Sequence, residues 1–155
     1  MVLIQQSDFN VNELLRQLHE NTRGQAGAIV TFTGYVRDFM PGRTTDTLFL
    51  EHYPGMCERE IQSLCEQAAT RWAIQDSLVV HRVGALQNGE QIVFVGVASA
   101  HRGDAFLACE FIIDALKTRA PFWKREHLAD GQSFWVEQRE SDEQKTRSWA
   151  APESN

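Results

Sequence analysis

Apolar residues recur at helical spacing in three stretches of the chain, and this periodicity predicts three helices. The first begins after Asn10, which forms a capping pattern with Glu13 three residues later. Its apolar positions are Val11, Leu14, Leu15 and Leu18. The second covers about 57–72 and the third about 104–118. The third is apolar on nearly every side, so we expect it to lie deep in the core.

Runs of alternating or continuous apolar residues predict strands between and after these helices. The predicted strands cover 28–37, 47–53, 78–83, 91–99, 122–127 and 133–140. The dipeptides Asn88-Gly89 and Asp130-Gly131 are typical of tight hairpin turns, so the strands on either side of each should pair antiparallel. Residues 38–46 are mostly polar and contain a proline and a glycine, which predicts a mobile loop.

This order of elements predicts one α+β domain over residues 1–155. Its helices would pack against a mostly antiparallel sheet, and the last two strands would form a C-terminal β-hairpin subdomain. At 155 residues and 43% hydrophobic, the chain can bury a substantial core. The polar tail 141–155 is predicted to fray unless a partner orders it.

Composition excludes several classes of function. The formal net charge of −6 argues against nucleic acid as the main partner, because that role needs a broadly basic face. The longest apolar run, 92–98, is too short to cross a bilayer, and the N-terminus lacks the pattern of a signal peptide. We therefore expect a cytoplasmic protein that does not bind membranes.

The cysteines predict neither a disulfide framework nor a metal site. They are three in number and form no CxxC pair: Cys57, Cys65 and Cys109. Cys65 and Cys109 fall among apolar residues of predicted helices, where a thiol behaves as a small hydrophobe. The sequence also lacks a Gly-rich phosphate loop, a serine-hydrolase elbow and His/Cys metal spacing. We expect no metal and no cofactor.

The segment 117–126, KTRAPFWKRE, carries the strongest functional signal. It places four cations, Lys117, Arg119, Lys124 and Arg125, around a Pro-Phe-Trp sequence in an otherwise acidic protein. The proline should end the helix, so Lys117 would lie at a helix end and Lys124 at a strand start, close in space. The helix dipole alone would explain Lys117 and Arg119. The whole cluster predicts an anion site in which crowding by like charge lets a lysine lose its proton and act in catalysis.

Three weaker signals add positive charge at strand ends and helix termini. His101 and Arg102 precede the third helix, whose first N–H groups could bind an anion, although His101 could equally be a solvated loop residue. Arg37 ends a strand beside the predicted loop and could grip a ligand or be a surface charge. Arg139 on the last strand could be solvated or reach a neighbouring subunit.

Several segments together resemble one family, the large catalytic subunit of molybdopterin synthase. The resemblance covers residues 27–149, and KTRAPFWKRE is its most specific element. The other matching segments are VTFTGYVR (30–37), LEHYPGM (50–56), HRVG (81–84), VGVASAHR (95–102), and the stretches 135–137 and 139–142.

The resemblance implies a sulfurtransferase of molybdenum cofactor biosynthesis with an α/β hammerhead fold. Members install the two dithiolene sulfurs of molybdopterin on cyclic pyranopterin monophosphate. The sulfur arrives as a thiocarboxylate on the C-terminal Gly-Gly of a small ubiquitin-like sulfur carrier subunit, so the catalytic chain needs no reactive cysteine. The implied assembly is a heterotetramer, a central homodimer with one small subunit at each end.

The resemblance also implies residue roles. Lys117 and Lys124 match the catalytic lysines, and Arg139 matches an arginine that crosses the dimer into the other subunit's site. The other matched substrate positions are Tyr35, Val36, Arg37, His101, Arg102, Arg125 and Glu126. The chain departs from the family pattern at two places. Many members have a His/Asn-rich stretch where this chain has Asp38-Phe-Met40. Some members have lysine at the position of Tyr35, so we expect Tyr35 to contact the substrate through its backbone and not through its side chain.

Two other classes of function stay open. A non-catalytic scaffold could dock a ubiquitin-like protein or an anionic ligand, but it would not need both lysines together with His101-Arg102. A hydrolase or lyase acting alone on a small phosphate ester would react without a thiocarboxylated partner. The retained residues favour the synthase.

Overall fold

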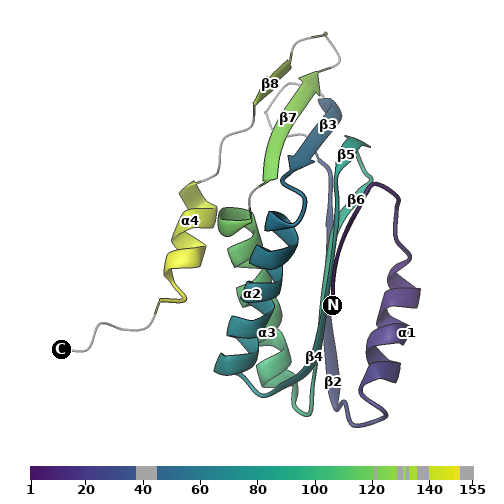
Figure 1. The fold of residues 1–155 in the computed structure, drawn as a ribbon, viewed down its shortest axis with the longest axis vertical. Coiled ribbons are helices and arrows are strands. Elements are labelled where there is room, and N and C mark those ends of the chain that lie inside the picture. The colour runs from purple at the N-terminus through teal and green to yellow at the C-terminus, as the bar shows by residue number, and fades with distance from the viewer. Residues whose placement is uncertain (38–44, 121, 129–130, 132, 136–139, 151–155) are drawn as a thin grey trace, which may run out of the picture.

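Two sheets and four helices make up the computed structural model, which describes residues 1–37, 45–120, 122–128, 131, 133–135 and 140–150 (Figure 1). The helices are α1 (Val11–Asn21), α2 (Met56–Arg71), α3 (Arg102–Arg119) and α4 (Glu140–Arg147). The strands are β1 (Val2–Gln5), β2 (Ala28–Tyr35), β3 (Thr45–His52), β4 (Ile74–Arg82), β5 (Gly84–Gln87), β6 (Gln91–Ser99), β7 (Phe122–Leu128) and β8 (Ser133–Trp135).

The first sheet has the strand order β1-β4-β6-β2 and forms the centre of the molecule. β1 pairs parallel with β4, whereas β4 with β6 and β6 with β2 are antiparallel. Helix α1 covers one face of this sheet, and α2 and α3 cover the other (Figure 1). The second sheet, β5-β3-β7-β8, is antiparallel throughout and lies at one end of the helical layer.

Strand β6 is apolar on both sides because both of its faces are covered. Val93, Val95 and Val97 belong to the cluster under α2 and α3, and Phe94 and Ala98 to the cluster under α1. The alternation of side chains along one strand therefore supplies two cores at once.

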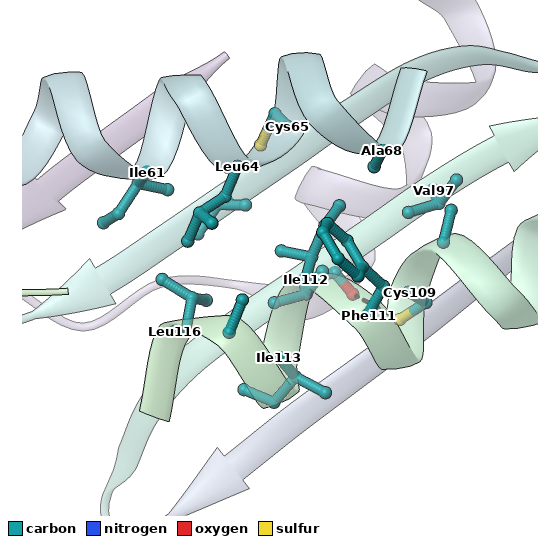
Figure 2. Close-up of a cluster of buried hydrophobic side chains, with 14 of the residues drawn as sticks. Ile61, Leu64, Cys65, Ala68, Val97, Cys109, Phe111, Ile112, Ile113 and Leu116 are labelled. Carbon is teal, nitrogen blue, oxygen red and sulfur yellow. Dashed lines mark hydrogen bonds between the residues drawn. The ribbon is translucent and has the colours of Figure 1, made fainter. Parts of the chain in front are cut away.

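The larger core lies between α2, α3 and the sheet (Figure 2). The side of α2 that carries Ile61, Leu64 and Ala68 faces α3, where Ile112 is fully buried. A third cluster, of Val36, Leu48, Leu50, Val83 and Leu86, joins the two sheets.

The predicted α+β architecture is confirmed, and most predicted elements are present. The Asn10 cap is confirmed as well, since its Oδ1 accepts the Glu13 N–H at 3.1 Å. The parallel strand β1 was not predicted, because four residues at the chain end carry little periodicity and depend on their pairing with β4.

The predicted hairpin at Asn88-Gly89 is partly wrong. β4 and β6 do pair antiparallel, but β5 lies between them in the chain and joins the second sheet. The turn closes from the Glu90 N–H to the Gln87 carbonyl at 3.1 Å, with Gly89 at φ 88°. Gly84, at φ 87°, lies where the chain leaves the first sheet for the second. Local turn signals cannot tell that the strand before the turn belongs to another sheet.

The prediction for the C-terminal segment is wrong for residues 140–150. Glu140 begins α4 instead of ending a strand, and this helix packs on α3. The Trp149 Nε1–H donates to Asp114 Oδ2 at 2.8 Å, and the Lys145 ammonium lies 3.0 Å from a Glu110 carboxylate oxygen. An eight-residue helix is marginal in isolation, so these tertiary contacts stabilise it. Residues 151–155 lie outside the described residues.

Three further predictions need adjustment. Helix α3 is buried along much of its length, but Phe106 and Leu107 are 60% and 42% exposed, so it is not in the core on every side. Of the predicted loop 38–46, residues 45 and 46 belong to β3 and 38–44 lie outside the described residues. Strands β7 and β8 pair antiparallel as predicted. Within the part of the chain that the structure describes, no helix is long and apolar enough to span a membrane.

We predict that Gly27→Ala destabilises the fold. An added Cβ at Gly27 would lie 2.0 Å from the backbone oxygen of Ala100, where the chain passes close to the end of β6. Such overpacking against backbone should lower the free energy of unfolding by about 2–3 kcal/mol. Gly103→Ala is the matched control, because its Cβ would meet nothing within 4 Å and the position is helical. Urea unfolding measures both, and equal midpoints for the two variants would contradict the packing argument.

Candidate active site

A pocket of about 270 Å³ lies where the C-terminal end of α3 meets both sheets. Much of its apolar lining comes from β2, β6 and α3, with Phe32, Ile92, Val93, Ile113 and Leu116, and Leu48 of β3 and Phe122 of β7 add to it. Its polar side chains come from five segments of the chain and include Arg37, His81, Lys117, Thr118, Lys124 and Asp142. A mostly apolar cleft with a few polar groups is the usual form of a small-molecule site.

The two predicted lysines both line this pocket. Lys117 lies in the last turn of α3, which ends at Arg119, and the C-cap residue Ala120 is extended at φ −73° and ψ 130°. The Phe122 N–H donates to the Ala120 carbonyl at 2.8 Å, and β7 begins there, with Lys124 on it. This abrupt change from helix to strand brings the two ammonium groups to one pocket, as the sequence predicted. Pro121 itself lies outside the described residues.

Arg119 holds two helices together and takes no part in the pocket. Its guanidinium donates to Glu60 Oε1 and Gln67 Oε1 of α2, both at 3.1 Å, and it does not line the pocket. It therefore ties the end of α3 to α2.

The end of β2 supplies three predicted positions, Tyr35, Val36 and Arg37, and all of them line the pocket. The Val36 N–H donates to the Glu90 carbonyl at 2.9 Å, and the Val36 carbonyl accepts the Gly89 N–H at 2.8 Å. These two bonds fix the backbone beside the pocket. Tyr35 is 57% exposed at the rim.

His101 and Arg102 do not line the pocket, so the structure does not bring them together with Lys117 and Lys124 within one chain. Their matched substrate-binding roles stay predictions. Arg102 and Lys117 lie fifteen residues apart in α3, about 22 Å along the helix axis. His101 occupies the N-cap position, makes no capping bond through its side chain, and is exposed. The length of α3 therefore places Arg102 and Lys117 at opposite ends of one helix.

The remaining predicted positions are described only in part. Arg125 and Glu126 belong to β7, where their backbones pair with Phe49 and Leu48 of β3. Arg139 lies outside the described residues. The roles of these three residues stay predictions.

Sequence reasoning missed His81, a buried polar residue of the pocket. Its ring is 8% exposed and stacks on Phe122, with ring centroids 4.0 Å apart and an interplanar angle of 16°. Nδ1 lies 2.8 Å from the Arg82 carbonyl oxygen. The sequence does contain a signal for it: His81 follows Val79 by two residues in a buried strand, so both side chains point to the same face of β4.

The His81 imidazole is held in its neutral form. Burial lowers its pKa to about 4, and the nearby charges of Lys124 and His52 act in the same direction, against a smaller opposing effect of the Arg82 carbonyl. Desolvation disfavours the charged form of a base, and a neighbouring ammonium adds repulsion. The pocket therefore contains a neutral imidazole next to its lysines.

Helix α4 completes one wall of the pocket with Asp142, which sequence reasoning also missed. The helix is anchored beside the pocket because the hydroxyls of Thr118 and Thr146 lie 2.7 Å apart. Among the described lining residues, three are cationic and Asp142 is the only acidic one. This balance suits an anionic ligand such as a phosphate ester.

The cysteines are poor candidates for chemistry. Cys57, Cys65 and Cys109 are buried, as predicted for the last two. Burial raises the pKa of all three thiols, that of Cys109 to about 11. Thiols of this kind are weak nucleophiles near neutral pH. Within the described residues, no group of three His, Cys, Asp or Glu side chains could hold a metal ion.

Comparison with known proteins identifies the family. The family model described as MoaE protein matches residues 4–119. The molybdopterin synthase catalytic subunit of Vibrio cholerae serotype O1 is 49% identical over 148 residues, which cover 96% of this chain and 97% of that protein. This chain belongs to the MoaE family. The resemblance found in the sequence is thereby confirmed.

Solved structures of MoaE proteins share the fold. The molybdopterin biosynthesis MoaE protein from Burkholderia ambifaria superposes with a TM-score of 0.83 at 40% identity, over 98% of this chain and 99% of that one. The molybdopterin synthase from Staphylococcus aureus gives a TM-score of 0.80 at 31% identity, over 87% and 96%. The predicted hammerhead-like α+β fold is confirmed. The MoaE family model ends with α3 and so includes Lys117, whereas the Vibrio relative matches over nearly the full chain.

We predict that His81 makes the fold of this MoaE protein sensitive to acid. Between pH 6.5 and about 4, the unfolded chain binds a proton at His81 and the folded chain does not. The free energy of unfolding should therefore fall as pH falls through this window, by about 2–3 kcal/mol between pH 7 and 4.5. His81→Gln should lose this part of the acid sensitivity. Urea unfolding of both proteins at the two pH values measures it, and an equal loss in both would contradict the buried neutral state.

Proposed function

We propose that this chain is the catalytic subunit of a molybdopterin synthase. It transfers sulfur from the thiocarboxylated C-terminus of a small ubiquitin-like carrier subunit to cyclic pyranopterin monophosphate, and so forms the dithiolene of molybdopterin. The observation that carries the proposal is that Lys117 and Lys124, the lysines matched to the family's catalytic pair, line one cationic pocket of a MoaE chain. The unpaired thiols Cys65 and Cys109 suit a reducing compartment, and we infer a cytoplasmic enzyme.

The pocket's chemistry suits this reaction. Arg37 and the two lysines match the negative charge of a phosphorylated pterin. The partner's thiocarboxylate is the sulfur nucleophile, so the buried thiols of this chain need not react. Attack of the thiocarboxylate sulfur forms a carbon–sulfur bond on the pterin side chain and breaks the carbon–oxygen bond at that carbon, and the oxygen leaves with a proton. Hydrolysis of the resulting thioester breaks its acyl carbon–sulfur bond, frees the partner's carboxylate and leaves the sulfur on the pterin. Both steps require protons to move, which a lysine in the pocket can do.

A homodimer would bring the partner's His101 and Arg102 to this pocket. Arg102, Phe106, Ile113 and Lys117 follow one another at spacings of four, seven and four, so they lie along one side of α3. Phe106 is a large aromatic residue exposed on that side. If two α3 helices pack antiparallel about a two-fold axis, Phe106 is covered and each Arg102 approaches the other chain's Lys117. The matched role of Arg139 also requires such a dimer.

We predict that Lys117→Ala abolishes nearly all turnover and leaves folding intact, and that Lys124→Ala is severely impaired. Lys117→Arg should not restore activity, because a guanidinium keeps its proton and cannot take part in acid–base transfer. The assay mixes the chain with cyclic pyranopterin monophosphate and a thiocarboxylated carrier subunit and measures dithiolene pterin. An active Lys117→Arg enzyme would rule out the acid–base role. Reaction without the carrier would instead favour a hydrolase or lyase that acts alone.

We also predict that Lys117→Ala and Arg102→Ala complement each other in a mixed dimer. Each heterodimer would contain one pocket with both residues intact, so purified heterodimers should recover about half of the wild-type activity. Lys117→Ala mixed with Lys124→Ala is the matched control, because both lysines line the pocket of the same chain and every pocket in that heterodimer is damaged. If the first pair is as inactive as the control, His101 and Arg102 do not complete the partner's site.

A further inference from the structure

One ring nitrogen of His81 is hydrogen-bonded within the protein, and the other is available to a ligand. Nδ1 lies 2.8 Å from the backbone carbonyl of Arg82, which can only accept a hydrogen bond. Nδ1 therefore carries the ring proton, and Nε2 of the neutral imidazole has a lone pair. Among the described residues, Nε2 has no hydrogen-bond partner.

Nε2 belongs to a ring that lines the pocket, where a bound ligand can donate a hydrogen bond to it. His81 is more than nine-tenths buried, and its ring lines the pocket. A buried polar atom without a partner is costly and uncommon in a folded protein. In a ligand pocket, a donor on the ligand can remove that cost. The stacked Phe122 ring and the bond to Arg82 hold the imidazole in place before any ligand arrives.

The charged groups around the ring decide what kind of ligand atom it can take. Lys124 of β7 and His52 of β3 both oppose protonation of His81. Lys117 of α3 and Asp142 of α4 belong to the same pocket, and the ring's neighbours in the sheet, Ile4 and Val93, are apolar. A neutral Nε2 acceptor cannot donate to a phosphate oxygen. It can bind an N–H group, and the phosphate is left to the cations.

We propose that His81 Nε2 accepts a hydrogen bond from a ring N–H of the reduced pterin and so orients the substrate in the pocket. This inference rests on the proposed function, because that function supplies a substrate with N–H donors at one end and a phosphate at the other. His81 is then a specificity-determining residue: it recognises the heterocycle, and the cations of the pocket recognise the anion.

The test measures the affinity of the full-length chain for cyclic pyranopterin monophosphate, without carrier subunit and without oxygen. His81→Phe keeps a ring against Phe122 but removes the acceptor, and it should weaken binding roughly ten-fold or more, because a pterin N–H is then buried without a partner. His81→Gln can place a carbonyl oxygen near the position of Nε2 and should recover most of that loss. Equal affinity of His81→Phe and the wild type would overturn the proposal, as would a loss in His81→Gln as large as that in His81→Phe.

His52→Phe is the matched control. His52 packs on the same Phe122 ring, with centroids 6.5 Å apart, and its Nε2 lies 3.9 Å from Glu58 Oε1, but it does not line the pocket. Its substitution should leave affinity unchanged, because His52 is the smallest of the influences on the pKa of His81, and burial and Lys124 still keep that ring neutral. If the wild-type chain itself does not bind the pyranopterin, the proposed function fails. If it binds and His81→Phe binds equally, only the role of His81 fails.

Nitrogen NMR provides a readout that does not depend on activity. In the ¹⁵N-histidine spectrum, the resonances of His81 are those that disappear in His81→Gln. They should show an unprotonated Nε2 at pH 7, and the Nε2 signal should shift when the pterin is added. Inorganic phosphate alone should leave it in place. A protonated Nε2 at pH 7, or a signal unmoved by the pterin, would overturn the proposal.

Discussion

The burial of β6 on both faces is the constraint on which the rest of the structure depends. Its odd-numbered valines pack under α2 and α3, while Phe94 and Ala98 pack under α1, so one strand joins two hydrophobic cores. Gly96 keeps the second core close, because a Cβ there would lie 2.9 Å from Leu18 of α1. Because β6 is packed on both faces, its neighbours β2 and β4 are fixed in position, and the ends of these two strands line the pocket.

The pocket exists because the second sheet meets the first at the end of α3. The third hydrophobic cluster fills this junction, and Ile92 and Phe122 pack against it and also line the pocket. Lys124 comes from the second sheet and Lys117 from the helix that covers the first, so their approach depends on how the two layers join. A loop could hold such groups, but strands and a helix hold them with less motion.

The charges in the pocket give its polar groups two different properties. Among the lining residues that the structure describes, three cations against one carboxylate make the pocket attractive to an anion. Burial, together with the nearby cations, keeps His81 neutral. One environment thus produces both a positive region and an uncharged acceptor. Helix α4 adds the carboxylate, which gives a functional reason for the contacts that fix this short helix on α3.

The sequence by itself determined the family, most of the helices and strands, and the pair of lysines, because periodicity and the KTRAPFWKRE segment are local properties of the chain. Only the tertiary structure decided which strands share a sheet, since Asn88-Gly89 predicts a turn but not that β5 leaves for a second sheet. It also showed that Arg102 and Lys117 lie fifteen residues apart along one continuous helix, that α4 forms, and that His81 belongs to the pocket. Each of these depends on contacts between residues far apart in the chain, and no local pattern encodes them.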